Sequence, residues 1–131
     1  MNADNARSMS LPLTTLAEHG PRLSPIVAGA WRLADWQWTA QQRLRWIEQC
    51  IELGVSSFDH ADIYGDYRVE ALFGEALALA PSLRERLQLV GKCGIKLVAP
   101  ARPEHRIKHY DSSAAHIAAS VDASLRSLRT D

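Results

Sequence analysis

The chain has 131 residues, of which 47% are hydrophobic and 23% are charged, and its 15 basic residues balance 15 acidic ones. This composition is that of a globular protein and excludes the collagen-like, disulfide-dense and disordered classes. A balanced charge argues against a dedicated nucleic-acid-binding protein, which has to neutralise phosphates. No apolar run reaches the ~18 residues of a membrane-spanning helix. We therefore expect neither a nucleic-acid nor a membrane partner.

The first ten residues, MNADNARSMS, are polar and lack the apolar segment of a secretory signal. We interpret residues 1–10 as a flexible leader. The two cysteines, Cys50 and Cys93, stand in no paired motif, which is typical of free thiols in a reducing compartment. The sequence therefore predicts a cytoplasmic protein whose folded part spans residues 11–131.

After the leader, predicted strands and helices alternate behind a short hairpin, whose turn is expected at Gly20-Pro21. Strands that are separated by helices pair in parallel through right-handed crossovers. The order therefore predicts an α/β fold made of a hairpin and three β/α units. The predicted strands span residues 26–30, 55–59 and 86–92, and the predicted helices span residues 40–53, 68–79 and 113–128.

End signals and apolar stripes support the first two helices. Thr39 and Gln42 have the spacing of a capping box, and Gly54 stands where a C-terminal cap glycine is expected. The helix over 68–79 has apolar residues at i, i+3, i+4, i+7 and i+8. These residues are Val69, Leu72, Phe73, Ala76 and Leu77.

The third helix follows a long segment, 93–111, that we expect to be a loop. Asp111 or Ser112 is the expected N-terminal cap of this helix. Its predicted core-facing stripe consists of Ile117, Val121, Leu125 and Leu128.

Three polar residues gather where ligands bind in parallel α/β folds, at the carboxyl ends of the strands. Asp59 and Lys92 are each expected to end a strand, and Tyr64 follows in the first connecting loop. A neighbouring ammonium stabilises a phenolate and makes a phenol a better proton donor. Tyr64 could then protonate a carbonyl oxygen. Lys92 would lower the pKa of its phenol, and Asp59 would keep Lys92 charged and oriented. A strand-end salt bridge beside a packed tyrosine is the alternative, and spacing alone favours it.

A metal site is the other chemistry that this segment suggests, because His60 and Asp62 form a His-x-Asp sequence beside Asp59. Adjacent residues of a strand point to opposite faces, so Asp59 and His60 cannot both point inward. The other histidines lack metal-ligand spacing. We therefore expect no metal, a solvated or supporting His60, a loop position for Asp62, and Asp66 as the cap of the next helix.

Two further clusters leave alternatives open. The basic segment 102–110 could meet an anionic substrate or a cofactor phosphate, although a solvated loop is the simpler interpretation. Trp31, Trp36 and Trp38 could wall an apolar pocket or could pack over the rim of the fold, and the sequence favours neither.

Four segments together resemble the aldo-keto reductase family, and its bacterial oxidoreductase branch in particular. They are AGAWRL, ELGVSSFDHADIYGDYRVEALFGEAL, LVGKCGI and HYDSSAAHIAASVDASLRSLRTD. The resemblance covers about residues 11–131. It implies a TIM-type (β/α)8 barrel with a hairpin closing its bottom, and the NADPH-dependent reduction of small aldehydes or ketones to alcohols.

The resemblance also implies site residues. The family's catalytic tetrad is Asp, Tyr, Lys and His, and Asp59, Tyr64 and Lys92 match the first three by position. The cofactor would lie close to Asp59 and to the turn after the first strand. That turn consists of Gly29, Ala30 and Trp31.

The tetrad histidine has no counterpart here, because in the family it closes a strand that follows a segment like LRTD, and this chain ends at Asp131. A full barrel needs about 250 residues. We therefore expect residues 11–131 to be the N-terminal part of a truncated barrel, inactive by itself. The alternative is a non-catalytic fragment that needs a partner or self-associates through the open edge of its third strand. A metal-dependent hydrolase using His60 and Asp62 is a weaker third hypothesis.

Overall fold

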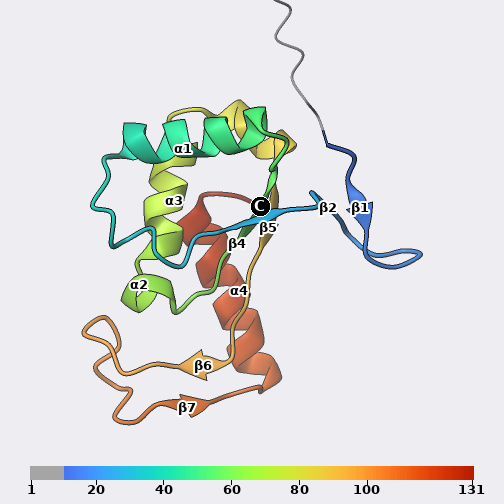
Figure 1. Ribbon diagram of the computed structural model, residues 1–131. Helices are drawn as coiled ribbons and strands as arrows, with labels where there is room; N and C mark the ends of the chain where they lie inside the picture. Colours follow the sequence, from blue (N-terminus) through green and yellow to red (C-terminus); the bar gives the residue numbers. More distant parts are fainter. Residues whose placement is uncertain (1–10) are drawn as a thin grey trace, which may run out of the picture.

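The computed structural model describes residues 11–131, so the predicted leader lies outside the described residues (Figure 1). Strands β1 (Thr14–Thr15) and β2 (Arg22–Leu23) pair antiparallel. The Gly20 N–H donates to the carbonyl of Ala17 in the connecting turn. The predicted hairpin is therefore confirmed.

Three short parallel strands form the central sheet, in the order β3-β4-β5. Each is shorter than the sequence predicts. Backbone hydrogen bonds nevertheless continue the pairing beyond β4 and β5, because the N–H groups of His60 and Asp62 donate to the carbonyls of Val90 and Lys92. The strands are β3 (Val27–Gly29), β4 (Ser57–Asp59) and β5 (Gln88–Val90).

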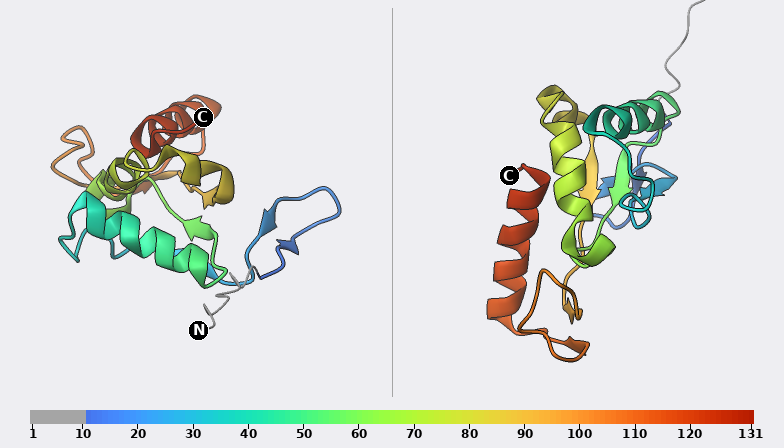
Figure 2. Two further views of the ribbon diagram at one scale, coloured as in Figure 1. Left: turned by 90° about the horizontal axis from the view of Figure 1, so that it is seen from above. Right: turned by 90° about the vertical axis from the view of Figure 1, so that its left-hand side faces the viewer.

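The helices that connect and follow these strands lie together on one side of the sheet (Figure 2). Helix α3 packs against both α1 and α4. This arrangement is a hairpin followed by three β/α units, the N-terminal portion of a (β/α)8 barrel, as predicted. The helical elements are α1 (Ala40–Glu52), α2 (Tyr64–Tyr67), α3 (Val69–Leu77), the 3-10 helix η1 (Pro81–Arg86) and α4 (Ala114–Leu128).

The ends of α1 follow the sequence signals. The Gln42 N–H donates to the Thr39 side chain at 3.2 Å, and the Thr39 N–H donates to the Gln42 side chain at 2.9 Å, so the capping box is confirmed. Gly54, with φ of 82°, follows the helix in the left-handed region, which costs glycine little because it has no Cβ.

Two predicted helix caps are wrong. The N-cap of α4 is Ser113, whose side chain accepts from the His116 N–H. Asp111 accepts instead from the Ser113 N–H at 3.0 Å. Asp66 does not cap α3, since the residue at that cap is Arg68 and makes no side-chain cap hydrogen bond. Asp66 lies in a left-handed turn, with φ of 56°, a conformation that aspartate tolerates better than most residues.

The segment that was predicted to be a loop contains another two-stranded sheet. Strands β6 (Ile95–Lys96) and β7 (His109–Tyr110) pair antiparallel at the bottom of the molecule in Figure 1. The Tyr67 hydroxyl ties this sheet to α2 by accepting from the Leu97 N–H at 2.8 Å. Strands of two residues carry no periodicity by which a sequence could reveal them.

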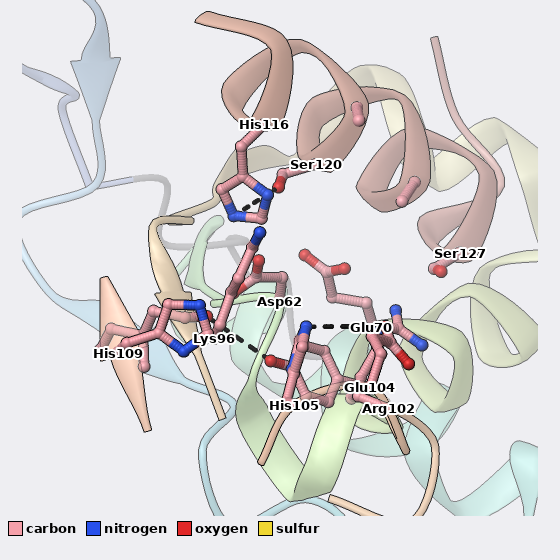
Figure 3. Close-up of a pocket in the computed structure, with 14 residues that line it drawn as sticks. Asp62, Glu70, Lys96, Arg102, Glu104, His105, His109, His116, Ser120 and Ser127 are labelled. Carbon is pink, nitrogen blue, oxygen red and sulfur yellow. Dashed lines mark hydrogen bonds and ion pairs between the residues drawn. The ribbon is translucent and has the colours of Figure 1, made fainter. Parts of the chain in front are cut away.

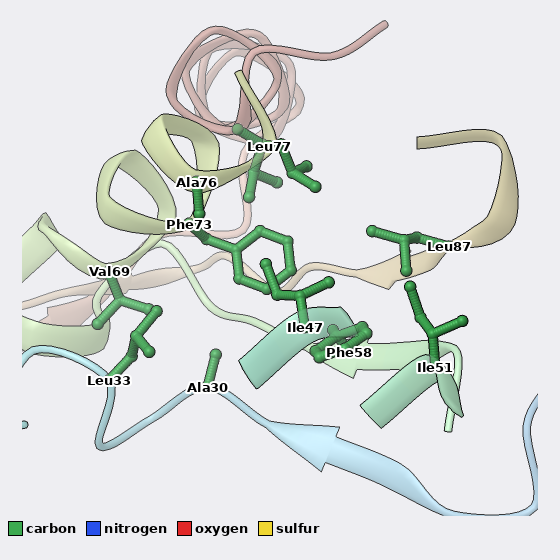
Figure 4. Close-up of a cluster of buried hydrophobic side chains, with 11 residues drawn as sticks. Ala30, Leu33, Ile47, Ile51, Phe58, Val69, Phe73, Ala76, Leu77 and Leu87 are labelled. Atoms are coloured by element: carbon green, nitrogen blue, oxygen red, sulfur yellow. The ribbon is translucent and has the colours of Figure 1, made fainter. Parts of the chain in front are cut away.

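The hydrophobic core lies between the sheet and the helices (Figure 4). Phe58 of β4 contacts Phe73 of α3, with their ring centroids 5.3 Å apart. The predicted stripe of α3 is confirmed, because four of its five members are buried in this core and Leu72 packs against it. The buried cluster contains Ala30, Leu33, Ile47, Ile51, Phe58, Val69, Phe73, Ala76, Leu77, Leu87 and Leu128.

The predicted stripe of α4 is buried at its C-terminal end alone. Ile117 and Val121 are 42% and 47% exposed. Helix α4 instead approaches α3 at Gly74, where an added Cβ would clash with the carbonyl oxygen of Ser127. This backbone contact turns part of the apolar stripe away from the core.

Candidate active site

The register of the sheet places Gly29, Asp59 and Val90 side by side at the carboxyl ends of their strands. Side chains paired across parallel strands point to the same face, and the next residue along each strand points to the other. Asp59 therefore shares a face with Lys92, two residues beyond Val90. Lys92 lies past the end of β5, so the prediction that it ends the strand is wrong by two residues.

Lys92 and Tyr64 both hydrogen bond to the carboxylate of Asp59. The Lys92 ammonium donates to Asp59 Oδ1 at 2.6 Å, and the Tyr64 hydroxyl donates to Asp59 Oδ2 at 3.2 Å. The Lys92 Nζ atom also lies 5.1 Å from the centroid of the Tyr64 ring. The structure thus brings together the three residues that the sequence placed at adjacent strand ends.

The charge of Lys92 is stabilised within this cluster. Partial burial lowers the pKa of Lys92, but hydrogen bonds to Asp59 and Tyr64 outweigh it and set the pKa above its ordinary value. The ammonium also donates to the carbonyl of His60 at 2.8 Å. The lysine is therefore held as a cation beside the phenol, which is the arrangement that an acid catalyst of this type needs.

His60 points to the opposite face from Asp59, as strand parity predicts. Its ring is 0% exposed and packs edge-on against Phe73, with the centroids 4.5 Å apart. Burial lowers the pKa of His60 to about 4, so the ring is neutral at neutral pH. The expectation of a solvated His60 is therefore wrong, because the residue after the strand end faces the core.

Metal binding finds no support in the geometry. Within residues 11–131, no group of three or more His, Cys, Asp and Glu side chains is placed to hold a metal ion. Asp62 lies in the loop between β4 and α2, where the sequence places it. Its side chain lines a cavity on the helix side of the sheet rather than the Asp59 cluster.

The predicted cofactor-contacting residues differ in how accessible they are to a ligand. Gly29 has open space around it, since no atom lies within 4 Å of a Cβ added there. Trp31 is 67% exposed, and it offers a free aromatic face. Ala30 is buried in the core, so its backbone alone could lie beside a cofactor. Gly29 and Trp31 are thus exposed, and Asp59 is partly exposed, at the carboxyl ends of the strands.

A pocket of about 440 Å³ adjoins Tyr64. Trp31 forms part of its wall, and Arg32 and Asp35 pair there at 2.8 Å. Sequence patterns did not single out these charged residues, although their position directly after Trp31 could have done so. The pocket is lined by Trp31, Arg32, Asp35, Ile63, Tyr64, Gly65, Asp66, Arg68 and Leu97.

The other two tryptophans are packing residues. The rings of Trp36 and Trp38 lie 4.5 Å apart, and Trp36 also contacts Trp46, which reaches Phe58 in the core. The structure thus divides the alternatives that the sequence left open: Trp31 lines a pocket, whereas Trp36 and Trp38 cover the rim.

In the described part of the chain, no helix has the length and apolar character needed to cross a membrane.

Comparison with known proteins agrees with this architecture. The model of the aldo/keto reductase family matches residues 25–131, and the chain belongs to that family. The holo form of the aldo-keto reductase AKR11C1 from Bacillus halodurans has a similar structure, with a TM-score of 0.72 and 26% identity. That match covers 92% of this chain and 37% of the solved one.

Bacterial oxidoreductases are its relatives in sequence. The uncharacterized oxidoreductase YcsN of Bacillus subtilis is 54% identical over 110 residues, and the oxidoreductase YdhF of Escherichia coli is 51% identical over 117 residues. A 6-dehydroglucose reductase of Agrobacterium fabrum is 46% identical over 110 residues. These matches cover 84%, 89% and 83% of this chain but 37%, 39% and 37% of the relatives. The chain therefore spans less than two fifths of the length of these relatives.

Proposed function

We propose that this chain contributes the proton-donating part of an NADPH-dependent aldo-keto reductase that reduces an aldehyde or a ketone to an alcohol. Family membership supports an oxidoreductase. The observation that carries the finer proposal is the cluster of Asp59, Tyr64 and Lys92, in which one carboxylate binds both a phenol and an ammonium.

Each member of the cluster has a distinct role in the proposal. Tyr64 donates its phenolic proton to the carbonyl oxygen of the substrate as negative charge develops there. Lys92 stabilises the phenolate that remains, and Asp59 holds the ammonium at 2.6 Å and keeps it charged. The proton moves from phenol to oxygen, and the alcohol forms when the carbonyl carbon has also received a hydride.

The nicotinamide cofactor, when bound, supplies that hydride. Gly29, Trp31, Asp59 and the backbone of Ala30 would lie beside its ring, because these residues leave an open, partly aromatic surface at the strand ends. Our choice of NADPH over NADH rests on the family resemblance. A cytoplasmic location suits such a cofactor and agrees with the absence of a disulfide between Cys50 and Cys93.

A hydroxylated aldehyde is the substrate class that we propose. Trp31 offers an aromatic face to the C–H groups of a sugar, and charged side chains in the same pocket can hydrogen bond hydroxyl groups. The name of the Agrobacterium relative, 6-dehydroglucose reductase, supports this choice. Arg32 and Arg68 are the donors in this pocket, and Asp35 and Asp66 are the acceptors.

NADPH oxidation by the protein expressed from its complete coding sequence tests this proposal. We expect turnover with 6-dehydroglucose and a higher kcat/KM than with an unsubstituted aldehyde such as hexanal. Trp31→Ala should lower kcat/KM for the sugar aldehyde more than for hexanal. Equal losses for the two substrates would contradict the sugar assignment, and a lack of turnover with every aldehyde and ketone would contradict the reductase itself.

We also propose that the 131-residue chain has no useful turnover by itself, because the described residues form three parallel strands and a full barrel has eight. Its alternative role is that of a non-catalytic fragment. The observation that favours this role is the outer edge of β5, which pairs with no further strand in the described sheet and lies next to an apolar groove of about 270 Å³ between β5 and α4. Such edges pair with other chains.

Size-exclusion chromatography of the purified 131-residue chain tests the fragment proposal. We expect oligomers and no NADPH oxidation with an aldehyde. A monomer with the turnover of a normal reductase would contradict both expectations. Because this test uses the short chain, its failure leaves the assignment of Tyr64, Lys92 and Asp59 in the complete protein standing.

A further inference from the structure

A second cavity lies between α3, α4 and the segment that carries β6 and β7 (Figure 3). Its volume is about 430 Å³, and its lining includes none of Asp59, Tyr64 and Lys92. Pockets of this size accommodate small organic molecules. Apart from His116, helix α4 contributes small side chains that leave the space unfilled, namely Ala119, Ser120, Ala123 and Ser127.

The carboxylate of Glu70 is the first sign that this cavity binds a ligand. Glu70 is 5% exposed, and its side chain points into the cavity (Figure 3). Its Oε1 atom accepts no hydrogen bond from the described residues. A buried carboxylate oxygen without a donor costs free energy. A ligand that donates a hydrogen bond to Glu70 would remove this cost.

A second carboxylate, that of Asp62, lines the same cavity. It forms no ion pair within 4.0 Å in the part of the chain that the structure describes. Burial raises the pKa of Asp62, although His116 and Arg102 nearby act to lower it. Burial and the charge of Asp62 raise the pKa of Glu70, against a hydrogen bond from Ser124 that lowers it. The two carboxylates repel each other, and a cation bound between them would relieve this repulsion.

Arg102 supplies the opposite charge. Its guanidinium lies over the ring of Tyr67, 4.5 Å from the centroid, and pairs with no carboxylate in the described segment. Lys96 already pairs with Asp111, at 2.8 Å.

Glu104 also lines the cavity and lies 3.6 Å from His105, a contact that is an ion pair when the histidine is protonated.

The two remaining histidines of the lining also have partners. The Nε2 atom of His116 lies 3.3 Å from the Ser120 hydroxyl oxygen, and Nδ1 of His109 lies 2.9 Å from the carbonyl oxygen of Ile107. Asp62, Glu70 and Arg102 are therefore the charged groups of the lining that contact neither an ion-pair partner nor a histidine within 4.0 Å in the described residues.

We propose that this cavity binds a small zwitterion of the amino-acid class, with its ammonium between Asp62 and Glu70 and its carboxylate on Arg102. An ammonium offers three donors to the two carboxylates, and a guanidinium binds a carboxylate through two parallel hydrogen bonds. A ligand with a positive charge alone would leave Arg102 unpaired. The proposal is independent of the reductase assignment.

Isothermal titration calorimetry on the protein expressed from its complete coding sequence tests the ligand class. The titrants are glycine, 4-aminobutyrate and 6-aminohexanoate, which differ in the spacing of their charges, with butylamine and butyrate as single-charge analogues. We expect the best zwitterion to bind about tenfold more tightly than either analogue, because each loses one charge-assisted contact. Equal binding of butylamine, or no binding of any zwitterion, would overturn the proposal.

Two variants locate the site. Glu70→Gln keeps the shape of the side chain, and Arg102→Gln removes the guanidinium, so each should weaken binding of that zwitterion about tenfold. The matched controls are Glu48→Gln on α1 and Arg106→Gln in the same loop, neither of which lines the cavity. Wild-type affinity in both test variants, or equal weakening in the controls, would show that the ligand binds elsewhere.

The Glu70 variant has a further readout that does not depend on the ligand. Because burial raises the pKa of Glu70, the unliganded Glu70→Gln variant should unfold at the same or a higher urea concentration than the wild type at neutral pH. A clear loss of stability would show that the carboxylate already has a structural partner, and this result would overturn the argument for an unpaired group.

Discussion

Lys92 Nζ lies 2.6 Å from Asp59 Oδ1, although the two residues are 33 positions apart in the chain. The contact exists because β4 and β5 pair in parallel and their carboxyl ends meet at one edge of the sheet. Tyr64 reaches the same carboxylate from the loop after β4. The sheet register therefore determines the geometry of the proposed acid catalyst.

We predict that Lys92→Met and Asp59→Asn act on the same step in the complete protein. Each should lower kcat for carbonyl reduction about a hundredfold, because each removes the charge that stabilises the phenolate or the group that holds it. The double variant should lose little more than the worse single one, since the two residues act as a unit. Steady-state kinetics measures all three.

The control for this cycle is Lys108→Met, an exposed lysine in the segment between β6 and β7. Its kcat should stay within about twofold of the wild-type value. Strictly additive losses for the two test variants would mean that Asp59 and Lys92 contribute separately, and the paired role would be wrong.

We predict that His60 makes the protein less stable in acid. Its pKa is lowered from 6.5 to about 4 in the folded state, chiefly by burial, so the unfolded chain binds a proton more readily. Stability is therefore lost as the pH falls from about 6.5 to about 4, by about 3 kcal/mol for this group. Urea unfolding of the wild type and of His60→Gln across this interval measures the difference in slope.

The matched control for that measurement is His19→Gln, because His19 is exposed at the tip of the hairpin. It should keep the wild-type slope of stability against pH. The His60→Gln variant can be less stable at every pH because it disturbs packing on Phe73, so the slope is the decisive quantity. An unchanged slope in His60→Gln would show that His60 is not buried as a neutral ring.

We predict that Gly74→Ala is destabilising, in contrast to the gain of up to ~1 kcal/mol that this change usually brings within a helix. The new Cβ would lie 2.1 Å from the Ser127 carbonyl oxygen and 3.0 Å from Leu128 Cα. Because these atoms belong to the backbone of α4, the two helices must separate, at a cost of about 1–3 kcal/mol. Urea unfolding measures the change.

Gly91→Ala is the control for the helix contact, since a Cβ there meets no atom within 4 Å. Its free energy of unfolding should stay within about 0.5 kcal/mol of the wild-type value. If Gly74→Ala matched this control, α3 and α4 would not be in backbone contact.

Features that repeat along the chain could be predicted from the sequence. The stripe of α3, the capping box at Thr39 and the alternation of strands and helices each arise from local periodicity or from a fixed spacing. Strand parity also predicts that Asp59 and His60 point to opposite faces of the sheet. What parity could not supply was the burial of His60, which depends on Phe73 arriving from α3.

Features that depend on contacts between distant segments were missed. The sheet of β6 and β7 needs two residues from each end of a long segment, and the left-handed conformation of Asp66 is set by the turn between Tyr64 and α3. The approach of α4 to Gly74 decides which face of α4 is buried. The cavity around Glu70 is lined by α3, α4 and the segment that carries β6 and β7, so no local motif could have indicated it.

The central claim is that Tyr64 donates the proton, and Tyr64→Phe in the complete protein tests it most directly. The substitution removes one hydroxyl and keeps the ring on which Lys92 lies. We predict a loss of about 10²–10⁴-fold in kcat, with NADPH affinity, followed by its fluorescence on binding, within about twofold of the wild-type value. Wild-type turnover in Tyr64→Phe would contradict the account.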